Sequence, residues 1–137
     1  MTTIEAVEAV NQSYGRCIMA PEFYDFFYDT FFKSSDRIAP LFKNTDLEKQ
    51  KRIMRGTITY VIMYAKNPQM TFASDKLKSV GEIHSRSKIN VPPDLYPFWA
   101  DSLIKAVRTF DKEFTPALEQ QWRQTLAPAI ELLKTHY

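Results

Sequence analysis

Glycine is scarce in this sequence of 137 residues: Gly15, Gly56 and Gly81 are the only three, and they are far apart. A loop that cradles phosphate groups needs closely spaced glycines, because its backbone N–H groups must approach the phosphate. The sequence therefore argues against a bound nucleotide, and equally against an integral NAD-dependent reductase module.

Cysteine and histidine are also rare. The single cysteine, Cys17, allows no internal disulfide, is typical of a reducing compartment, and is interpreted as a half-buried structural thiol. His84 and His136 are the only histidines, and no CxxC or HExxH motif occurs, so a structural zinc ion would lack ligands. The sequence contains no recognisable constellation for hydrolytic chemistry.

Long apolar runs and a strong charge bias are missing as well. No run approaches the roughly 18 apolar residues that a membrane-spanning helix needs, and the N-terminus lacks the pattern of a signal peptide. The net charge is only +2, with the basic residues spread among sixteen acids. We therefore expect a cytoplasmic protein with neither a membrane nor a nucleic-acid partner.

Aromatic residues, in contrast, are abundant, with ten Phe, seven Tyr and two Trp. A small protein with so many rings has a bulky core or a pocket for something flat. The length predicts one domain over residues 1–137, large enough to bury about 65–70% of its unfolded surface.

Helical periodicity runs through most of the sequence, and strand alternation is nearly absent. The sequence therefore predicts an all-α fold with about six principal helices. Capping boxes that begin at Thr2 and at Thr45 predict two helix starts. Pro21 predicts a third, and Thr115-Pro116 predicts the start of the last helix.

His84 is the most informative single residue. It lies on the apolar face of a helix predicted for about residues 74 to 87, one and two turns after Val80 and Leu77. A neutral imidazole can bind haem iron axially, and its second nitrogen could be oriented by a backbone carbonyl near Val80. The alternative is an ordinary core histidine, which is the more frequent fate of a lone histidine on an apolar face.

Several segments together carry a family resemblance. They are Phe27-Tyr28-Asp29-Thr30-Phe31-Phe32, Pro40-Leu41-Phe42-Lys43-Asn44-Thr45-Asp46, Gln50, His84 and Leu95-Tyr96-Pro97. In this order and spacing the sequence resembles the globin family, in particular bacterial single-domain globins and the haem domain of flavohaemoglobins. The resemblance spans about residues 4 to 135 and implies a globin fold that binds haem b.

On the proximal side of the haem, the resemblance gives His84 the place of the iron ligand. Phe42 matches the phenylalanine that packs on the haem, and Tyr96 matches a proximal-side tyrosine. Val80 and Val91, which flank His84 in the sequence, complete the expected haem contacts. Lys88 could meet the haem propionates, although an exposed lysine is more often simply solvated.

On the distal side, Tyr28 and Gln50 match the tyrosine and glutamine that face the bound gas, and Met54 matches the apolar residue over the iron. A phenol and a carboxamide can both donate hydrogen bonds in an apolar cavity, where they count most. The alternatives are a core aromatic for Tyr28 and a solvated helix position for Gln50.

The sequence departs from the flavohaemoglobin pattern near its end. The place of a glutamate that backs the proximal pair falls at His136-Tyr137, which offers no carboxylate, and His136 is expected to be frayed and exposed.

The expected function is reversible binding of dioxygen, with carbon monoxide or nitric oxide as other ligands. Nitric oxide dioxygenation would need an external reductase. A haem-based gas sensor and a haem-free globin-like signalling or interaction module remain the alternatives.

Overall fold

The computed structural model describes residues 3–137, which form six α-helices, two short 3-10 helices and no strand. This confirms the predicted all-α fold with six principal helices. The α-helices are α1 (Thr3–Cys17), α2 (Phe23–Ser34), α3 (Leu47–Lys66), α4 (Thr71–Ile83), α5 (Tyr96–Phe110) and α6 (Pro116–Lys134), and the 3-10 helices are η1 (Ala39–Phe42) and η2 (Pro93–Leu95).

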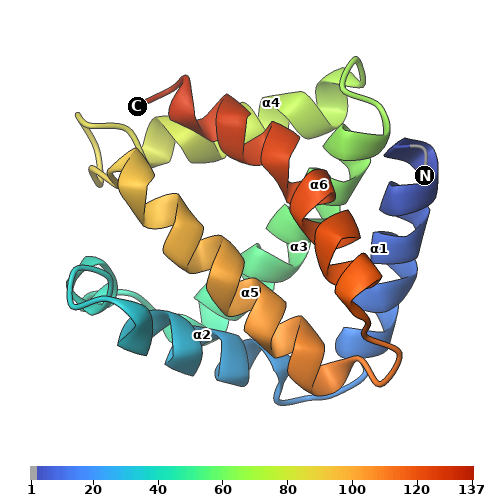
Figure 1. Cartoon of the computed structure of the whole chain (residues 1–137). Coiled ribbons are helices and arrows are strands. Elements are labelled where there is room, and N and C mark those ends of the chain that lie inside the picture. Colours follow the sequence, from blue (N-terminus) through green and yellow to red (C-terminus); the bar gives the residue numbers. More distant parts are fainter. Residues whose placement is uncertain (1–2) are drawn as a thin grey trace.

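The helices are layered across one another rather than aligned in a bundle (Figure 1). α2 packs along α5 and α1 along α6, while α3 lies behind them in contact with α4, α6 and α1. The largest fully buried side chains come from every α-helix, and they include Trp122, Phe23, Phe27, Ile58, Leu77, Leu103 and Val10. This arrangement leaves a space that is bounded by α2 to α6, where the candidate site lies.

The helix starts follow local capping chemistry, although not always at the expected residue. Thr115 caps α6 as predicted, since its side chain accepts the backbone N–H of Leu118 at 3.1 Å. α3 is capped by Asp46 instead of Thr45, because the Asp46 carboxylate accepts from two backbone N–H groups. α2 begins at Phe23, two residues after Pro21. The capping box at Thr2 lies outside the described residues.

α4 is shifted from its predicted range of about 74 to 87. It begins at Thr71, where no side chain caps it, and ends at Ile83. The chain reverses after Ile83 through backbone hydrogen bonds from Ile89 to Ile83 and from Asn90 to Ser85, and Asn90 takes a left-handed φ of 58°. Asparagine tolerates that conformation better than most residues, so Asn90 can take part in the reversal without strain.

Helical periodicity favours an inward position for Ile4 and Ile53, but both are exposed. Ile4 is 61% exposed in the first turn of α1, and Ile53 is 48% exposed on α3. Ile53 nevertheless lines the cavity described below. No helix within residues 3–137 is both long enough and apolar enough to cross a membrane.

Candidate functional site

A cavity of about 270 Å³ lies between α2, α3, α4, α5 and α6. Its walls are mostly aliphatic and aromatic side chains. Eight of the nine residues singled out in the sequence line it, namely Tyr28, Phe42, Gln50, Met54, Val80, His84, Val91 and Tyr96. The structure therefore brings together residues that lie up to 68 positions apart in the sequence.

Lys88 is the residue that the structure does not bring to the cavity. It is exposed in the turn that follows α4, where its backbone N–H donates to the carbonyl of Ser85. The reversal of the chain after Ile83 turns this position toward solvent. A contact of Lys88 with the haem propionates, which are charged groups, stays a prediction.

His84 lies at the C-terminal end of α4 as its capping residue, not within a helix that continues to Ser87. Its backbone N–H donates to the carbonyl of Val80 at 3.0 Å, while its ring Nδ1 is buried and has no hydrogen-bond partner among the described residues. The expected bond from the ring to a carbonyl near Val80 is thus not formed. Burial lowers the pKa of the imidazole, which keeps it neutral at pH 7.

A buried polar atom without a partner costs about 1–3 kcal/mol, so this imidazole is held at an energetic disadvantage. The ring lies 6.4 Å from that of Tyr96, with 30° between their planes. Tyr96 is 7% exposed at the start of α5. The neutral ring is a free nitrogen base on the wall of an apolar cavity, which is a suitable state for a metal ligand.

Tyr28 and Gln50 come from α2 and α3, and the Gln50 side chain lies close enough to the phenol to counter part of the rise in its pKa that burial causes. Tyr28 is only 4% exposed, and its ring packs against those of Phe27, Phe32 and Phe42. The phenol and the carboxamide thus both line the cavity, while their contact with a bound gas stays a prediction. The interpretation of Gln50 as a merely solvated residue does not fit this position.

Phe42 and Met54 add apolar surface next to this pair. Phe42 ends η1 and meets the Tyr28 ring nearly edge-on, with 6.0 Å between centroids and 68° between planes. Met54 follows Gln50 by one turn of α3 and is 4% exposed. Apolar groups therefore border the two donors inside the cavity, where a hydrogen bond is stronger than one in open water.

Other cavity residues were not singled out in the sequence. Trp99 lines the cavity and packs edge-on against Phe27, and α6 contributes a further row of apolar side chains, Leu126, Ala129, Ile130 and Leu133. Helical periodicity marks these residues as buried. It does not distinguish a residue that faces a cavity from one that faces another helix, so no sequence signal separates the two cases.

The end of α6 also contacts the loop that follows His84. The hydroxyl of Tyr137 donates to Asn90 Oδ1 at 2.6 Å, and the Arg86 guanidinium lies 4.7 Å from the centre of the Tyr137 ring. His136 is half-buried, and a Cβ at Gly81 would lie 3.0 Å from its Cβ. His136 is therefore not the exposed, frayed residue that the sequence predicted.

Comparisons with known proteins agree with this architecture. No protein-family model and no curated protein matches the chain. A solved structure from Pseudomonas aeruginosa PAO1, described as that of a protein structurally highly homologous to a human haemoglobin, is 35% identical to the chain. The match covers 96% of this chain and 98% of that one, with a TM-score of 0.90.

Proposed function

The chain belongs to the globin family, and from this premise we propose that it binds one haem b and, with it, reversibly binds dioxygen. The observation that carries the proposal is His84, a neutral, buried imidazole on the wall of an apolar cavity, whose Nδ1 has no hydrogen-bond partner within residues 3–137. The described residues contain no group of three or more His, Cys, Asp or Glu that could hold a metal ion by themselves. A single imidazole is enough for a metal ion whose other ligands are provided by a macrocycle such as a porphyrin.

The cavity residues fit haem by their chemistry. His84 would ligate the iron, and Phe42, Met54, Val80, Val91 and Tyr96 would pack on the apolar porphyrin. Burial of a large flat apolar surface provides most of the binding free energy, at about 25 cal/mol per Å². When bound, haem supplies an iron atom that takes one diatomic gas molecule as a further ligand.

Tyr28 and Gln50 determine how firmly such a gas molecule is held. Both side chains line the cavity, and Gln50 lies close enough to Tyr28 to influence the pKa of the phenol. A phenol O–H and an amide N–H can both donate to a partly negative dioxygen molecule, and each such bond contributes about 1.5–3 kcal/mol. We therefore expect slow release of dioxygen. Bound carbon monoxide, which carries less negative charge, should be stabilised less by the same two donors.

The test of the haem site is the visible absorption spectrum of the purified protein after reconstitution with haem, in ferric, ferrous and carbonyl forms. We expect stoichiometric uptake and the spectrum of a nitrogen-ligated haem, which His84→Ala should lose or grossly alter. Lys78→Ala is a matched control, since Lys78 is exposed on the same helix and does not line the cavity. Failure of the wild-type protein to take up haem would favour a haem-free globin-like signalling or interaction module.

The test of the gas-binding wall is the rate of dioxygen release from the loaded protein. Replacement of Tyr28 by Phe removes one charge-assisted hydrogen bond, so release should become about 10- to 100-fold faster. Gln50→Leu should have an effect in the same direction. An unchanged rate in both variants would show that neither side chain contacts the gas.

Nitric oxide dioxygenation is the second candidate function, and it is favoured by the same pair of donors. In that reaction dioxygen and nitric oxide combine to nitrate, and an external reductase returns one electron to the iron. His136 and Tyr137 follow α6 and lie near the end of α4 and the loop after His84. Neither of these two residues offers a carboxylate. Nitrate formation in the presence of a reductase would identify this activity, and a gas-dependent complex with another protein would instead identify a sensor.

A further inference from the structure

An ion pair between Asp25 and Lys51 joins α2 to α3 close to the two polar residues of the cavity. The Lys51 ammonium group contacts the carboxylate of Asp25 on α2, and it also pairs with Glu48 on its own helix at 2.9 Å. Tyr28 follows Asp25 by three residues on α2, and Gln50 directly precedes Lys51 on α3. The ion pair therefore links the two segments that carry the phenol and the carboxamide.

Direct packing contributes little to the position of α2 against α3. α2 packs along α5, whereas α3 packs on α4, α6 and α1, and α2 and α3 do not form a closely packed pair. A second polar link passes through α1, where the Tyr14 hydroxyl lies 2.5 Å from that of Tyr24 on α2 and donates to the carbonyl of Arg55 on α3 at 3.1 Å. The placement of α2 against α3 near the cavity thus depends on polar links more than on direct packing.

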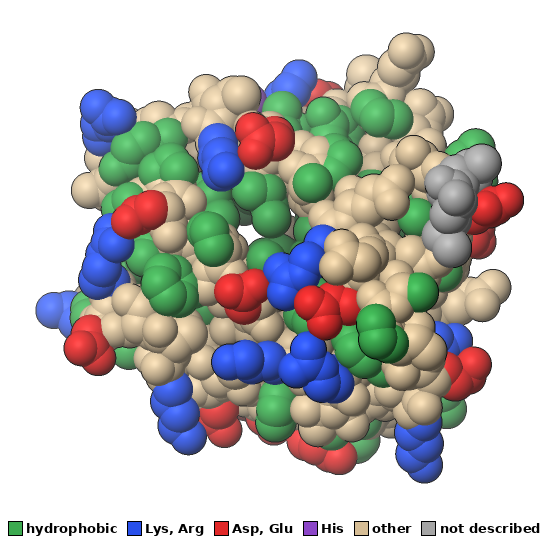
Figure 2. All heavy atoms as spheres, in the orientation of Figure 1, with side chains coloured by type: hydrophobic (Ala, Val, Ile, Leu, Met, Phe, Trp, Pro, Cys, Tyr) green, Lys and Arg blue, Asp and Glu red, His purple; other side chains and the backbone are tan. Residues whose placement is uncertain are grey.

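The Lys51 side chain is less exposed than the lysines of two other ion pairs. It is 21% exposed, whereas Lys66 is 58% exposed and Lys134 is 40% exposed. Figure 2 shows acidic and basic side chains interspersed over the face that it displays, which is the usual setting of an ion pair on open surface. Such pairs contribute little, because water and salt screen them, and the half-buried ammonium group of Lys51 is screened less.

We propose that the ion pair between Asp25 and Lys51 is a positioning device for gas binding, which holds α2 against α3 so that Tyr28 and Gln50 meet the gas molecule together. The proposal rests on the proposed function, because it assumes that a gas molecule binds at these two side chains. Neither Asp25 nor Lys51 lines the cavity. They are positioning residues, which act on the gas through the phenol and the carboxamide.

The positive charge of Lys51 could also act directly, and the variant Asp25→Asn separates the two possibilities. This variant breaks the link to α2 but keeps the ammonium group, which still has Glu48 as a partner on its own helix. If the ion pair positions Tyr28, dioxygen release becomes faster in the variant. If only the charge of Lys51 mattered, the ammonium group would attract a partly negative dioxygen molecule more strongly without Asp25, and release would become slower.

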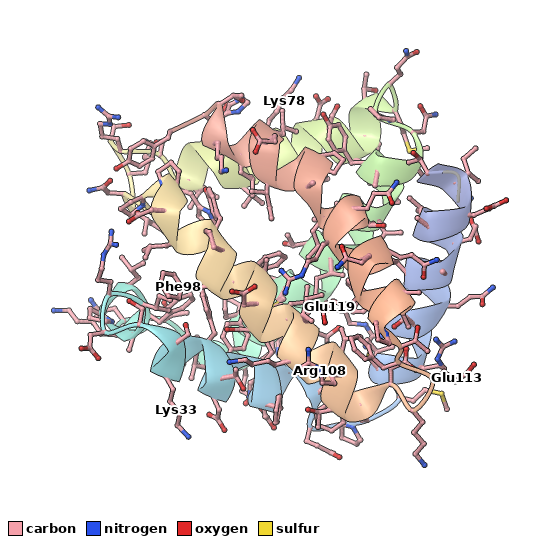
Figure 3. The ribbon with its side chains drawn as sticks, viewed as in Figure 1. Lys33, Lys78, Phe98, Arg108, Glu113 and Glu119 are labelled. Atoms are coloured by element: carbon pink, nitrogen blue, oxygen red, sulfur yellow. The ribbon has the colours of Figure 1, made fainter. Side chains whose placement is uncertain are left out.

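The test is the rate of dioxygen release from the haem-loaded protein. We expect Asp25→Asn and Lys51→Met to release dioxygen about threefold faster or more, because a charge-assisted hydrogen bond is partly lost, and Lys51→Arg to stay close to the wild type. Lys66→Met is the matched control on α3, since it breaks an ion pair with Glu8 of α1 at the other end of the helix. Lys33→Met is the control on α2, since its side chain is exposed and extends away from the molecule (Figure 3). Both controls should release dioxygen at the wild-type rate.

A protein without the two donors shows whether the ion pair acts through them. When Tyr28→Phe and Gln50→Leu are combined, the further change Asp25→Asn should leave the release rate unchanged, because no donor remains to be positioned. An equal acceleration by Asp25→Asn with and without the two donors would overturn the proposal. Slower or unchanged release from the single variant Asp25→Asn would overturn it as well.

A measurement without haem keeps this proposal separate from the proposed function. Gln50 lies close enough to Tyr28 to influence the pKa of its phenol. In the purified protein before haem is added, we expect a nuclear Overhauser effect between the Tyr28 ring and the Gln50 side-chain amide, weakened in Asp25→Asn and retained in Lys66→Met. An effect of equal strength in Asp25→Asn would overturn the positioning role. Failure to take up haem would end the proposed function but would leave this result interpretable.

Discussion

The ionisation of Tyr28 determines what it can do in the cavity. Burial raises the pKa of its phenol to about 12, while the hydrogen bond with Gln50 and the charge of Lys51 act in the opposite direction. Lys51 is itself held by Asp25 on α2 and by Glu48, so its ammonium group stays close to Tyr28. The phenol therefore keeps its proton at neutral pH and remains a hydrogen-bond donor.

This predicts the pH dependence of gas release. Because the pKa of Tyr28 lies near 12 rather than 10, dioxygen release from the haem-loaded protein should be constant from about pH 7 to 10. Stopped-flow measurements over this range test the prediction, with Tyr28→Phe as the reference for a missing donor. A sharp acceleration between about pH 9 and 10 would show that the phenol ionises as it does in water.

Cys17 is more deeply buried than the sequence suggested. Its side chain is 0% exposed rather than half-buried, and burial raises the pKa of the thiol to about 12. Because only the thiolate reacts, we predict that native protein at pH 8 resists a chromogenic thiol reagent while unfolded protein reacts at once. Rapid stoichiometric labelling of the native protein would contradict this description of α1.

At the scale of the helices, the three glycines have different surroundings. A Cβ on Gly15 in α1 would meet no atom within 4 Å, whereas one on Gly81 in α4 would meet His136 at 3.0 Å. Gly15→Ala should therefore raise the free energy of unfolding by about 0.5–1 kcal/mol, through the better helix propensity of alanine. Gly81→Ala gains the same propensity but must displace His136, and we expect no net stabilisation.

Urea unfolding of the two variants beside the wild type measures this difference. Both substitutions add one methyl group to a helix, so each serves as the control for the other. Equal stabilisation by the two variants would mean that the end of α6 moves away from α4 without cost. A loss of stability in Gly15→Ala would contradict the open surroundings of that glycine.

The sequence predicts which segments form helices, because helix formation depends on local patterns. It predicts where a helix begins or ends only where a side chain caps that end. Thr115 caps its own helix, and the prediction held. α4 has no side-chain cap at its start, and its end is set by backbone bonds within the loop after Ile83. Those bonds depend on how the loop folds back, which periodicity does not encode.

At the scale of the whole molecule, the family resemblance supplied what local patterns could not. Tyr28, Gln50 and His84 are far apart in the sequence, and only a known order of segments predicts that they share one cavity. The row of α6 side chains on the cavity wall and the contact of Tyr137 with Asn90 were not predicted. Both depend on how closely two distant segments approach. That residues 1–137 act as one globin domain stays a prediction.

A buried polar network also joins distant parts of the molecule. Arg16 on α1 donates two hydrogen bonds to Asp111, at 2.6 and 2.9 Å, in the connection between α5 and α6. Ser13 donates to the same carboxylate at 2.6 Å and accepts from the indole N–H of Trp122 on α6 at 2.9 Å. The Asp111 side chain is 0% exposed, so these bonds link three segments within the core.

The carboxylate of Asp111 should therefore matter more for stability than an exposed ion pair. Asp111→Asn keeps the shape but removes the buried charge that pairs with Arg16 and leaves that guanidinium only the exposed carboxylate of Glu113, at 3.5 Å, so we expect a cost of about 2–4 kcal/mol. Asp94→Asn is the control, since Asp94 also has a two-bond contact with an arginine, Arg37, but both side chains are more than half exposed. We expect little change in stability from this second variant.

The dependence of this effect on pH follows from the pKa of Asp111. Burial raises it, but the bonds from Arg16, Ser13 and the backbone N–H of Glu113 lower it further, so the net pKa is below its usual range. The unfolded state then binds the proton more readily, and the stabilisation is complete above about pH 4 and is lost as the pH falls below it. In urea unfolding, the gap between wild type and Asp111→Asn should be constant from about pH 5 to 7 and narrow below about pH 4. A gap that does not change with pH would mean that the carboxylate stabilises the protein by its shape and packing, not by its charge.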